Sequence, residues 1–461
     1  MFSPQGRSRR INSYAFSFVA CVLLCGVANA APSITLSKKT GPPTSRILVS
    51  GSGFQPNVGV DIFFDMTDKA LTVTNNKGEF HDAGINASRS ARPGEHWVTA
   101  LERSNDKGAQ APFLVRTNWS EFQFSPDHEG VNPYENVLSQ KNVARLNSKW
   151  TYAGGQGLVF STPTVSNGIA YVTAIGLWAV DAETGSLRWS FEAGYSTFFC
   201  TPAVFDGVLY VASPDGYFYA LNANTGNVLW NYIGTSYNGD SAPVVAEGIV
   251  YYTGDKTIYA LNAKSGVLVW SYPTGSYARS APAVANGVVY AGSNDGYLYA
   301  LDARKGTLLW QASIGLIDFS SPVVAEGAVY VGAYGGTFYA LDAVTGAVLW
   351  NFPTSQSIES SPLVSNGLVY LLSGESNLYA LSAATGALVW KYPLGGESFN
   401  LLSLALANNV LYLGYNALYA LDPQTGKLLW NSPQSGLGSP VVADGVVYAS
   451  SQGGLSAFSL K

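Results

Sequence analysis

Tryptophan returns at an almost constant interval along the last two-thirds of this 461-residue chain. Successive members of the series are 39, 41 or 40 residues apart. They are Trp150, Trp189, Trp230, Trp270, Trp310, Trp350, Trp390 and Trp430. A fixed period of roughly 40 residues is the signature of a repeat architecture, in which each copy is one supersecondary unit. We therefore expect residues 147–461 to be copies of one small unit.

Each copy divides into four short strands separated by turns. In the copy that ends at Trp310, Asn286-Gly287 forms the first turn, because both residue types tolerate the positive φ of a two-residue hairpin. A later turn at Gly306 leads into the tryptophan strand. Four strands in roughly 40 residues is the size of one blade of a β-propeller. The hairpin turn recurs at 167–168, 206–207, 247–248, 326–327, 366–367, 408–409 and 444–445.

The two ends of the repeat region are incomplete in complementary ways. Trp150 has no first three strands before it, and residues 439–461 have no tryptophan strand after them. We therefore predict an eight-bladed propeller whose last blade is completed by the strand around Trp150. Such a pairing leaves no unpaired sheet edge at the seam.

The N-terminal 30 residues have the layout of a secretory signal peptide. Three arginines within residues 7–10 precede an apolar run at 15–28, which is too short to span a bilayer, and residues 28–30 are Ala-Asn-Ala. A lipidated Cys21 or Cys25 is the alternative, and we favour simple cleavage. The sequence thus predicts an exported protein, periplasmic or extracellular, with no transmembrane segment in the mature chain.

Charge and cysteine content narrow the possible partners. Residues 150–461 hold 9 Lys and Arg against 18 Asp and Glu, a net charge of −9, whereas residues 31–149 have a net charge of +1. An acidic propeller argues against binding to nucleic acid or to an anionic membrane surface. After cleavage Cys200 is the single cysteine, so no internal disulfide is expected.

Two further segments precede the repeats. Residues 33–117 contain six short alternating runs between Gly, Pro and Asn clusters, which predicts a small β-sandwich. Within it, the stretches Ile47–Phe54 and Val60–Phe64 resemble bacterial Ig-like modules of the IPT/TIG type. Residues 118–146, hereafter the bridge, are irregular but too aromatic for a flexible linker, so we expect them to pack against one face of the ring.

The repeat carries the pattern Ala-x-Asp-x-x-Thr-Gly-x-x-x-Trp, as in Ala179–Trp189. This resembles the tryptophan-docking motif of the PQQ-like β-propeller repeat family, which includes quinoprotein dehydrogenases and BamB-like outer-membrane assembly propellers. The resemblance implies a structural role for the eight tryptophans, each packed against the neighbouring blade. Because all eight occupy equivalent places, none is expected to bind a cofactor.

The dehydrogenases of that family imply features that are missing here. They hold the quinone PQQ between a vicinal cysteine pair and a tryptophan, beside a calcium ion, and the mature chain has neither adjacent cysteines nor a Cys-x-x-Cys-His haem motif. His81, His96 and His128 all precede the repeats, which argues against a histidine-based site inside the ring. We predict no catalytic residue, no metal and no cofactor, with PQQ and calcium only in the dehydrogenase alternative.

One position varies in chemistry from copy to copy. It lies three residues before the proline of the first strand and should surround the mouth of the central channel. Its occupants are Phe160, Phe199, Asp240, Arg279, Phe319, Glu359, Leu401 and Leu437. Repeat symmetry does not dictate this set, so the first six are candidate binding residues for a small ligand or peptide. The alternative is that these loops merely vary and that Arg279 pairs with Asp240 or Glu359.

The sequence favours a non-enzymatic scaffold over an enzyme. Its expected partner is another envelope or extracellular protein, or a small ligand at the channel mouth, and we expect a monomer. A PQQ-dependent dehydrogenase is the second hypothesis. Carbohydrate binding is the third, suggested only by the 28 tyrosines.

Overall fold

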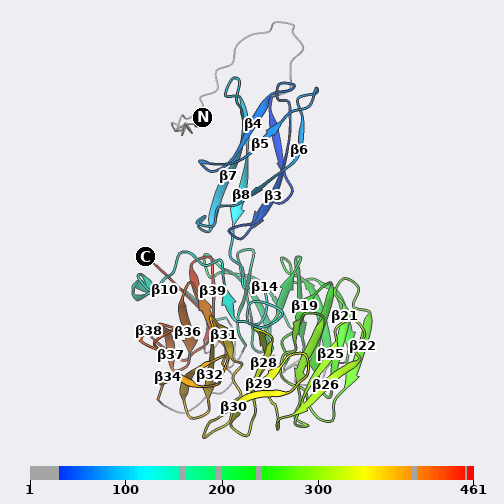
Figure 1. The fold of residues 1–461 in the computed structure, drawn as a ribbon, viewed down its shortest axis with the longest axis vertical. Helices are drawn as coiled ribbons and strands as arrows, with labels where there is room; N and C mark the ends of the chain where they lie inside the picture. The colour runs from blue at the N-terminus through cyan, green and yellow to red at the C-terminus, as the bar shows by residue number, and fades with distance from the viewer. Residues whose placement is uncertain are drawn as a thin grey trace, which may run out of the picture. The chain divides into compact units, whose positions relative to one another are not determined.

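The computed structural model describes residues 31–154, 161–192, 200–234, 241–395, 402–451 and 454–460. The chain divides into two compact units, residues 1–116 and 117–461, and strands dominate both (Figure 1). The one helical element within the described ranges is a 3-10 turn, η1 (Val143–Arg145). The predicted all-β fold is thus confirmed. Across the same residues, no helix has the length and apolar composition needed to cross a membrane.

The N-terminal unit consists of two sheets around one apolar core. One sheet has the order β1 (Ser33–Leu36), β3 (Arg46–Ser52), β6 (Phe80–Asn86); the other has the order β2 (Thr40–Gly41), β8 (Gly108–Val115), β7 (Gly94–Glu102), β4 (Gly59–Phe64), β5 (Thr67–Val73). Every second residue of β3, of β4 and of the second half of β7 is buried, because side chains alternate between the faces of a strand. Ile47 and Phe64 thereby meet Phe113 in the core.

The second unit consists of eight sheets in the described residues. The sheet of β35 (Leu404–Ala407) has a fifth strand, β9 (Val131–Asn132), which pairs parallel with β35. All eight sheets have four antiparallel strands, which follow one another along the chain in seven of the sheets. Their bounds, sheet by sheet, are β11 (Thr164–Ser166), β12 (Ile169–Thr173), β13 (Leu177–Asp181), β14 (Leu187–Phe191); β15 (Ala203–Phe205), β16 (Val208–Ala212), β17 (Tyr217–Asn222), β18 (Val228–Ile233); β19 (Val244–Ala246), β20 (Ile249–Gly254), β21 (Thr257–Asn262), β22 (Leu268–Pro273); β23 (Ala283–Ala285), β24 (Val288–Gly292), β25 (Tyr297–Asp302), β26 (Leu308–Ser313); β27 (Val323–Ala325), β28 (Ala328–Gly332), β29 (Thr337–Asp342), β30 (Val348–Pro353); β31 (Leu363–Ser365), β32 (Leu368–Ser373), β33 (Asn377–Ser382), β34 (Leu388–Pro393); β35 (Leu404–Ala407), β36 (Val410–Gly414), β37 (Ala417–Leu421), β38 (Leu428–Ser435); and β39 (Leu437–Ala443), β40 (Val446–Ser451), β41 (Gly454–Leu460), β10 (Leu146–Tyr152).

The first strands of these sheets surround a common axis. Each contacts the first strand of the next sheet, from β11 through β15, β19, β23, β27, β31 and β35 to β39, and β39 contacts β11 again. The sheets therefore form a closed ring of the propeller type. The ring closes where β10 pairs antiparallel with β41, with Trp150 opposite Ala457. The strand around Trp150 thus completes the C-terminal sheet, as the sequence predicts.

The first turn of each sheet has the expected hairpin geometry. Asn286 and Gly287 have φ of 51° and 76°. Glutamate replaces asparagine at two of these turns, and Glu326 is held at a φ of 51°, which favours glycine or asparagine. The structure thus confirms the turn and shows a strained residue in it.

The tryptophans join neighbouring sheets. The indole Nε1 of Trp310 donates to the carbonyl oxygen of Ala343 at 3.1 Å, and the Tyr290 hydroxyl donates to the same oxygen at 3.0 Å. Gly346 has a φ of 73°, and a Cβ there would come within 2.6 Å of the Trp310 ring. The same indole bond is made by Trp150, Trp189, Trp230, Trp270, Trp350 and Trp390.

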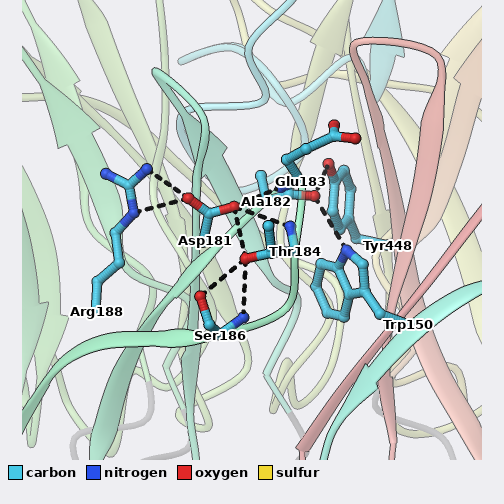
Figure 2. Close-up of polar contacts among 8 residues, drawn as sticks. All are labelled: Trp150, Asp181, Ala182, Glu183, Thr184, Ser186, Arg188 and Tyr448. Carbon is cyan, nitrogen blue, oxygen red and sulfur yellow. Dashed lines mark hydrogen bonds and ion pairs between the residues drawn. The ribbon is translucent and has the colours of Figure 1, made fainter.

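Figure 2 shows this joint at the seam of the ring. Trp150 of β10 and Tyr448 of β40 both donate to the Ala182 carbonyl oxygen, at 3.2 Å each. Asp181 shapes the turn by accepting the backbone N–H of Thr184 at 2.9 Å. Burial alone would raise the pKa of Asp181, but hydrogen bonds from Arg188 and Thr184 lower it to about 2. The carboxylate therefore stays charged and keeps the turn rigid.

Trp430 is the exception in the series. The sheet it faces ends in β10 and lacks the turn that offers a carbonyl in the other copies. Trp430 instead packs edge-on against Phe458, with ring centroids 5.9 Å apart. In the equivalent tyrosine, Tyr412, the buried hydroxyl has no hydrogen-bond partner within the described residues.

Candidate functional site

The bridge runs around one face of the ring and bonds to the first strand of sheet after sheet. Trp119 exchanges two backbone hydrogen bonds of 2.8 Å with Val165, and the backbone N–H of Val284 donates to Pro126 O at 2.7 Å. Equivalent backbone N–H donors are Val204 to Ser120 O, Val324 to Asp127 O and Leu406 to Gly130 O. Side chains make the remaining links, in which Val245 N donates to Glu121, Gln123 donates to Pro362 O and Asn132 donates to Val442 O. The bridge therefore reaches all eight sheets of the ring.

Phe122 of the bridge closes the channel at this face. Its ring is buried against Ala242 and Ala281. The His128 imidazole packs edge-on against Phe122, with ring centroids 5.2 Å apart. The His128 Nδ1 lies 3.0 Å from the carbonyl oxygen of Pro322. The bridge thus places one of the three histidines against the propeller. Burial lowers the pKa of His128 to about 4, so its imidazole is neutral at physiological pH.

A belt of hydroxyl groups lines the channel above Phe122. The residues directly before the first-strand proline slot are Thr162, Thr201, Ala242, Ala281, Ser321, Ser361, Ser403 and Ser439. These hydroxyl groups join one copy to the next. The backbone N–H of Ala281 donates to the Ser321 hydroxyl oxygen at 2.9 Å, and the backbone N–H of Ser321 donates to the Ser361 hydroxyl oxygen at 3.0 Å. The two copies without a hydroxyl are the alanines that contact Phe122. The break in the repeat is therefore explained by packing.

Arg279, Phe319 and Glu359 stand at the other end of this channel and line the same cavity. The Arg279 guanidinium lies 5.3 Å from the ring centroid of Tyr277 and 5.6 Å from that of Phe319. Its Nη1 is 3.4 Å from an Asp318 carboxylate oxygen. These contacts orient the guanidinium at the mouth, since cations are attracted to the faces of aromatic rings.

The cavity, hereafter the well, has a volume of about 70 Å³. At roughly 10–15 Å³ for each water, it holds about five. Phe122 is its apolar floor, hydroxyls form its wall and the Arg279 side chain lies at its mouth. The Glu359 carboxylate accepts a hydrogen bond from the Ser357 hydroxyl at 3.0 Å.

The structure brings together three of the residues expected at the mouth. Leu437, in contrast, is buried within β39 and does not line the cavity. Phe160, Phe199, Asp240 and Leu401 lie outside the described residues. Among the described residues Arg279 lies close to Asp318, and the alternative pairing with Asp240 falls on a residue outside them.

Sequence reasoning missed the floor of the well and most of its wall. Phe122 belongs to the bridge, and only its aromatic character hinted that it would pack. The hydroxyl belt had a visible signal, a serine or threonine before the proline slot in six of eight copies. The two exceptions, Ala242 and Ala281, mark where another group fills the channel.

The described residues do not fit the quinone cofactor of the dehydrogenases. The described lining of the well has no cysteine pair that could cover the quinone. Calcium takes roughly six to eight oxygen ligands, and Glu359 is the one carboxylate in the described lining. Within the described ranges no group of three or more His, Cys, Asp or Glu is placed to hold a metal ion. Cys200 is buried, and its Sγ lies 3.1 Å from the Ala212 carbonyl oxygen.

A second cavity, of about 460 Å³, lies between the bridge and the first-strand turns. Its lining includes Asp127, Glu129, Glu247 and Glu326 together with Arg304, which pairs with Glu247 at 2.7 Å. Burial and the nearby Asp127 and Glu326 charges raise the pKa of Glu129. The cavity is strongly acidic, in keeping with the negative charge of the ring.

A family model confirms the class of the ring. The model described as outer membrane protein assembly factor BamB, built on PQQ-type repeats, matches residues 136–238, 234–316 and 315–461. The chain therefore belongs to this family of propellers. No match was found among curated protein sequences.

Solved structures with the same fold have different roles. BamB from Moraxella catarrhalis shares 19% identity over 68% of this chain and 99% of its own, with a TM-score of 0.56. A quinohemoprotein alcohol dehydrogenase from Pseudomonas putida HK5 shares 16% identity over 75% of this chain and 80% of its own, with a TM-score of 0.63. A computationally designed protein, Ika8, shares 18% identity over 68% and 99%, with a TM-score of 0.60. At such identities the likeness shows the fold, and the function must be argued from the site.

Proposed function

We propose that this chain is an exported, monomeric, non-enzymatic binding scaffold of the cell envelope or the extracellular space. In this proposal an eight-bladed propeller presents the binding site, and an Ig-like module in front of it acts as spacer or adhesion element. Export rests on the signal peptide read from residues 1–30, which lie outside the described residues. The family supports an envelope role, since its model is described as an outer membrane protein assembly factor.

The observation that carries the proposal is the polar well. Its described lining joins Phe122 of the bridge to residues that precede the first strands of several sheets. The mouth holds Arg279, Phe319 and Glu359, whose chemistry the repeat does not require. Arginine and aromatic residues are enriched at protein interfaces, so this mouth is suited to a protein partner or a small ligand.

Site-specific photo-crosslinking in the native host tests the proposal. A photoreactive side chain at Phe319 should give a partner adduct, and Arg279→Ala in the same chain should diminish it. Val344 is 82% exposed in the turn between β29 and β30, is not among the residues that line the well, and serves as the control position. Equal crosslinking from both positions, or an adduct indifferent to Arg279→Ala, would contradict a partner site at the mouth.

A PQQ-dependent dehydrogenase is the second candidate, favoured by the fold shared with the alcohol dehydrogenase. The misfit of the described lining to a quinone and calcium speaks against it. Adding PQQ with calcium to the purified protein decides the matter. Bound-quinone absorbance together with dye-linked oxidation of an alcohol or sugar would establish the enzyme and overturn the scaffold.

Carbohydrate binding, which the tyrosine content suggested, has no support from the second-strand tyrosines. These eight side chains are buried and pack within the ring. They are Tyr171, Tyr210, Tyr251, Tyr290, Tyr330, Tyr370, Tyr412 and Tyr448.

A further inference from the structure

The N-terminal unit carries a pocket of about 350 Å³ at the edge of its two sheets. Arg46 of β3, Lys69 of β5 and Asn86 of β6 line it, together with Gly84 and Ile85. Strand β5 is the edge of one sheet and lies beside β6, the edge of the other. The two cations therefore reach the same pocket from opposite sheets.

The polar side chains of this pocket offer hydrogen-bond donors that lack acceptors. Within the described residues neither Arg46 nor Lys69 forms an ion pair, whereas Arg103 of the same unit lies 2.7 Å from a carboxylate oxygen of Asp61. No carboxylate is among the residues that line the pocket. Arginine and lysine side chains can only donate, and the amide of Asn86 adds two further N–H groups. A group that accepts hydrogen bonds and carries negative charge would complete this set.

Strand β6 leaves room for the guanidinium of Arg46. Arg46 stands opposite Asn86 in the ladder, and Leu48 stands opposite Gly84. A Cβ at Gly84 would lie 3.4 Å from Nη2 of Arg46 and 3.8 Å from its Nε. The guanidinium thus lies across a glycine in the middle of a strand, where glycine weakens the strand and often marks the close approach of another group. A guanidinium that rests on a strand loses less freedom when it binds a ligand.

A β-bulge sets the direction of Lys69. The register of β4 and β5 changes from Ile62 opposite Ala70 to Phe63 opposite Asp68, so Lys69 is the extra residue of β5. Bulges change the direction of a side chain and are common at sheet edges. Lys69 is half-buried, whereas Asp68 directly before it is exposed. The bulge therefore brings the lysine, and not the aspartate, into the lining of the pocket.

We propose that this pocket binds a phosphate group. Phosphate accepts hydrogen bonds at three or more oxygens, so it can use the Arg46 guanidinium, the Lys69 ammonium and the Asn86 amide together. A carboxylate has two oxygens in one plane and meets fewer of these donors. Free phosphate and the phosphate ester of a lipid head group share this chemistry. The inference concerns the N-terminal unit and does not depend on the binding function proposed for the ring.

Phosphorus NMR of inorganic phosphate mixed with the purified full chain tests the proposal. The phosphate signal should broaden at a protein concentration at which chloride at equal ionic strength does not abolish the effect. Arg46→Met and Lys69→Met should each weaken binding about ten-fold, as expected for the loss of one charge-assisted hydrogen bond.

Two variants separate a built site from diffuse positive charge. Gly84→Val keeps every charge and places methyl groups where the guanidinium lies, so phosphate binding should weaken as much as in Arg46→Met. Arg46→Lys keeps the charge, removes the planar fork and should also weaken binding. Circular dichroism of each variant checks that the sandwich has folded.

Lys107→Met is the matched control, because Lys107 is an exposed lysine of the same unit outside the lining of the pocket. It should bind phosphate as the unaltered protein does. Three results would overturn the proposal: no broadening of the phosphate signal, an equal loss in Lys107→Met and Lys69→Met, or unaltered binding in both Gly84→Val and Arg46→Lys.

Flotation with vesicles of phosphatidylcholine, with or without phosphatidic acid, identifies the source of the phosphate. Retention that requires phosphatidic acid and is lost in Lys69→Met, beside binding of the free ion, would assign the pocket to a lipid head group. Binding of the free ion without retention would assign it to a soluble phosphate. Retention without binding of the free ion would contradict a phosphate site, since diffuse charge alone accounts for it.

Discussion

Removing one hydroxyl from each of two equivalent tyrosines should change stability in opposite directions. The Tyr290 hydroxyl is buried and donates to the Ala343 carbonyl oxygen at 3.0 Å. The Tyr412 hydroxyl is buried next to the C-terminal sheet, which lacks the turn that offers a carbonyl oxygen in the other copies, and it has no partner within the described residues. Phenylalanine has the shape of tyrosine without the hydroxyl, so each substitution isolates one hydrogen-bonding group.

The two free-energy changes follow from the hydrogen bonds. Tyr290→Phe loses one buried bond, which costs about 1 kcal/mol, since the Trp310 indole still satisfies the Ala343 oxygen. Tyr412→Phe removes a buried polar group without a partner, which should stabilise the protein by about 1 kcal/mol. The expected difference between the variants is thus about 2 kcal/mol.

Urea unfolding followed by tryptophan fluorescence measures this difference. The midpoint should fall for Tyr290→Phe and rise for Tyr412→Phe at an unchanged slope, because neither substitution alters the surface exposed on unfolding. If both variants lose the same stability, the Tyr412 hydroxyl has a partner at the seam and the reasoning is refuted.

Three further perturbations test the bridge and the turns. The pKa of His128 is near 4 in the folded protein and 6.5 in the unfolded chain, so the stability that neutral His128 contributes is complete above pH 6.5 and is lost as the pH falls towards 4. The loss amounts to about 3 kcal/mol of unfolding free energy. Urea unfolding across this range should show a weaker pH dependence for His128→Phe than for the unaltered protein. Glu326→Asn should raise the unfolding free energy by about 0.5–1 kcal/mol, because asparagine tolerates a φ of 51° better than glutamate does. Asn286→Glu should lower the unfolding free energy by a similar amount. Melting curves that do not separate the two variants would contradict this. Phe122→Ala should cost about 3–5 kcal/mol by emptying the channel floor, and a loss below about 1 kcal/mol in denaturant would show that the floor is not packed as described.

The ring could be predicted from sequence because its causes are local and repeated. Asn286-Gly287 and its equivalents specify a hairpin by backbone preference alone. The tryptophan at the end of each copy specifies where the sheets meet. Strand β6 (Phe80–Asn86) in the N-terminal unit escaped prediction, since His81, Asp82 and Gly84 interrupt the alternation and tertiary pairing with β3 decides its conformation.

The site could be predicted only where it departs from symmetry. Arg279, Phe319 and Glu359 stood out because neighbouring copies differ at that position. The contact of Phe122 with Ala242 and Ala281 joins residues more than 100 positions apart, and no periodic signal points to it. The contact of Arg279 with Asp318 depends on loop geometry, so it could not be predicted from the sequence.

The bridge also has a consequence for how such a ring can evolve. Its length and the order of its bonds suit one number of sheets, from Trp119 on β11 to Asn132 on β39. A duplication or deletion of one repeat would leave a first strand without its bond or a bridge residue without its strand. A change in repeat number would therefore break bonds to the bridge and destabilise the ring. Substitutions at the mouth, where the bridge makes no such bonds, leave those bonds intact.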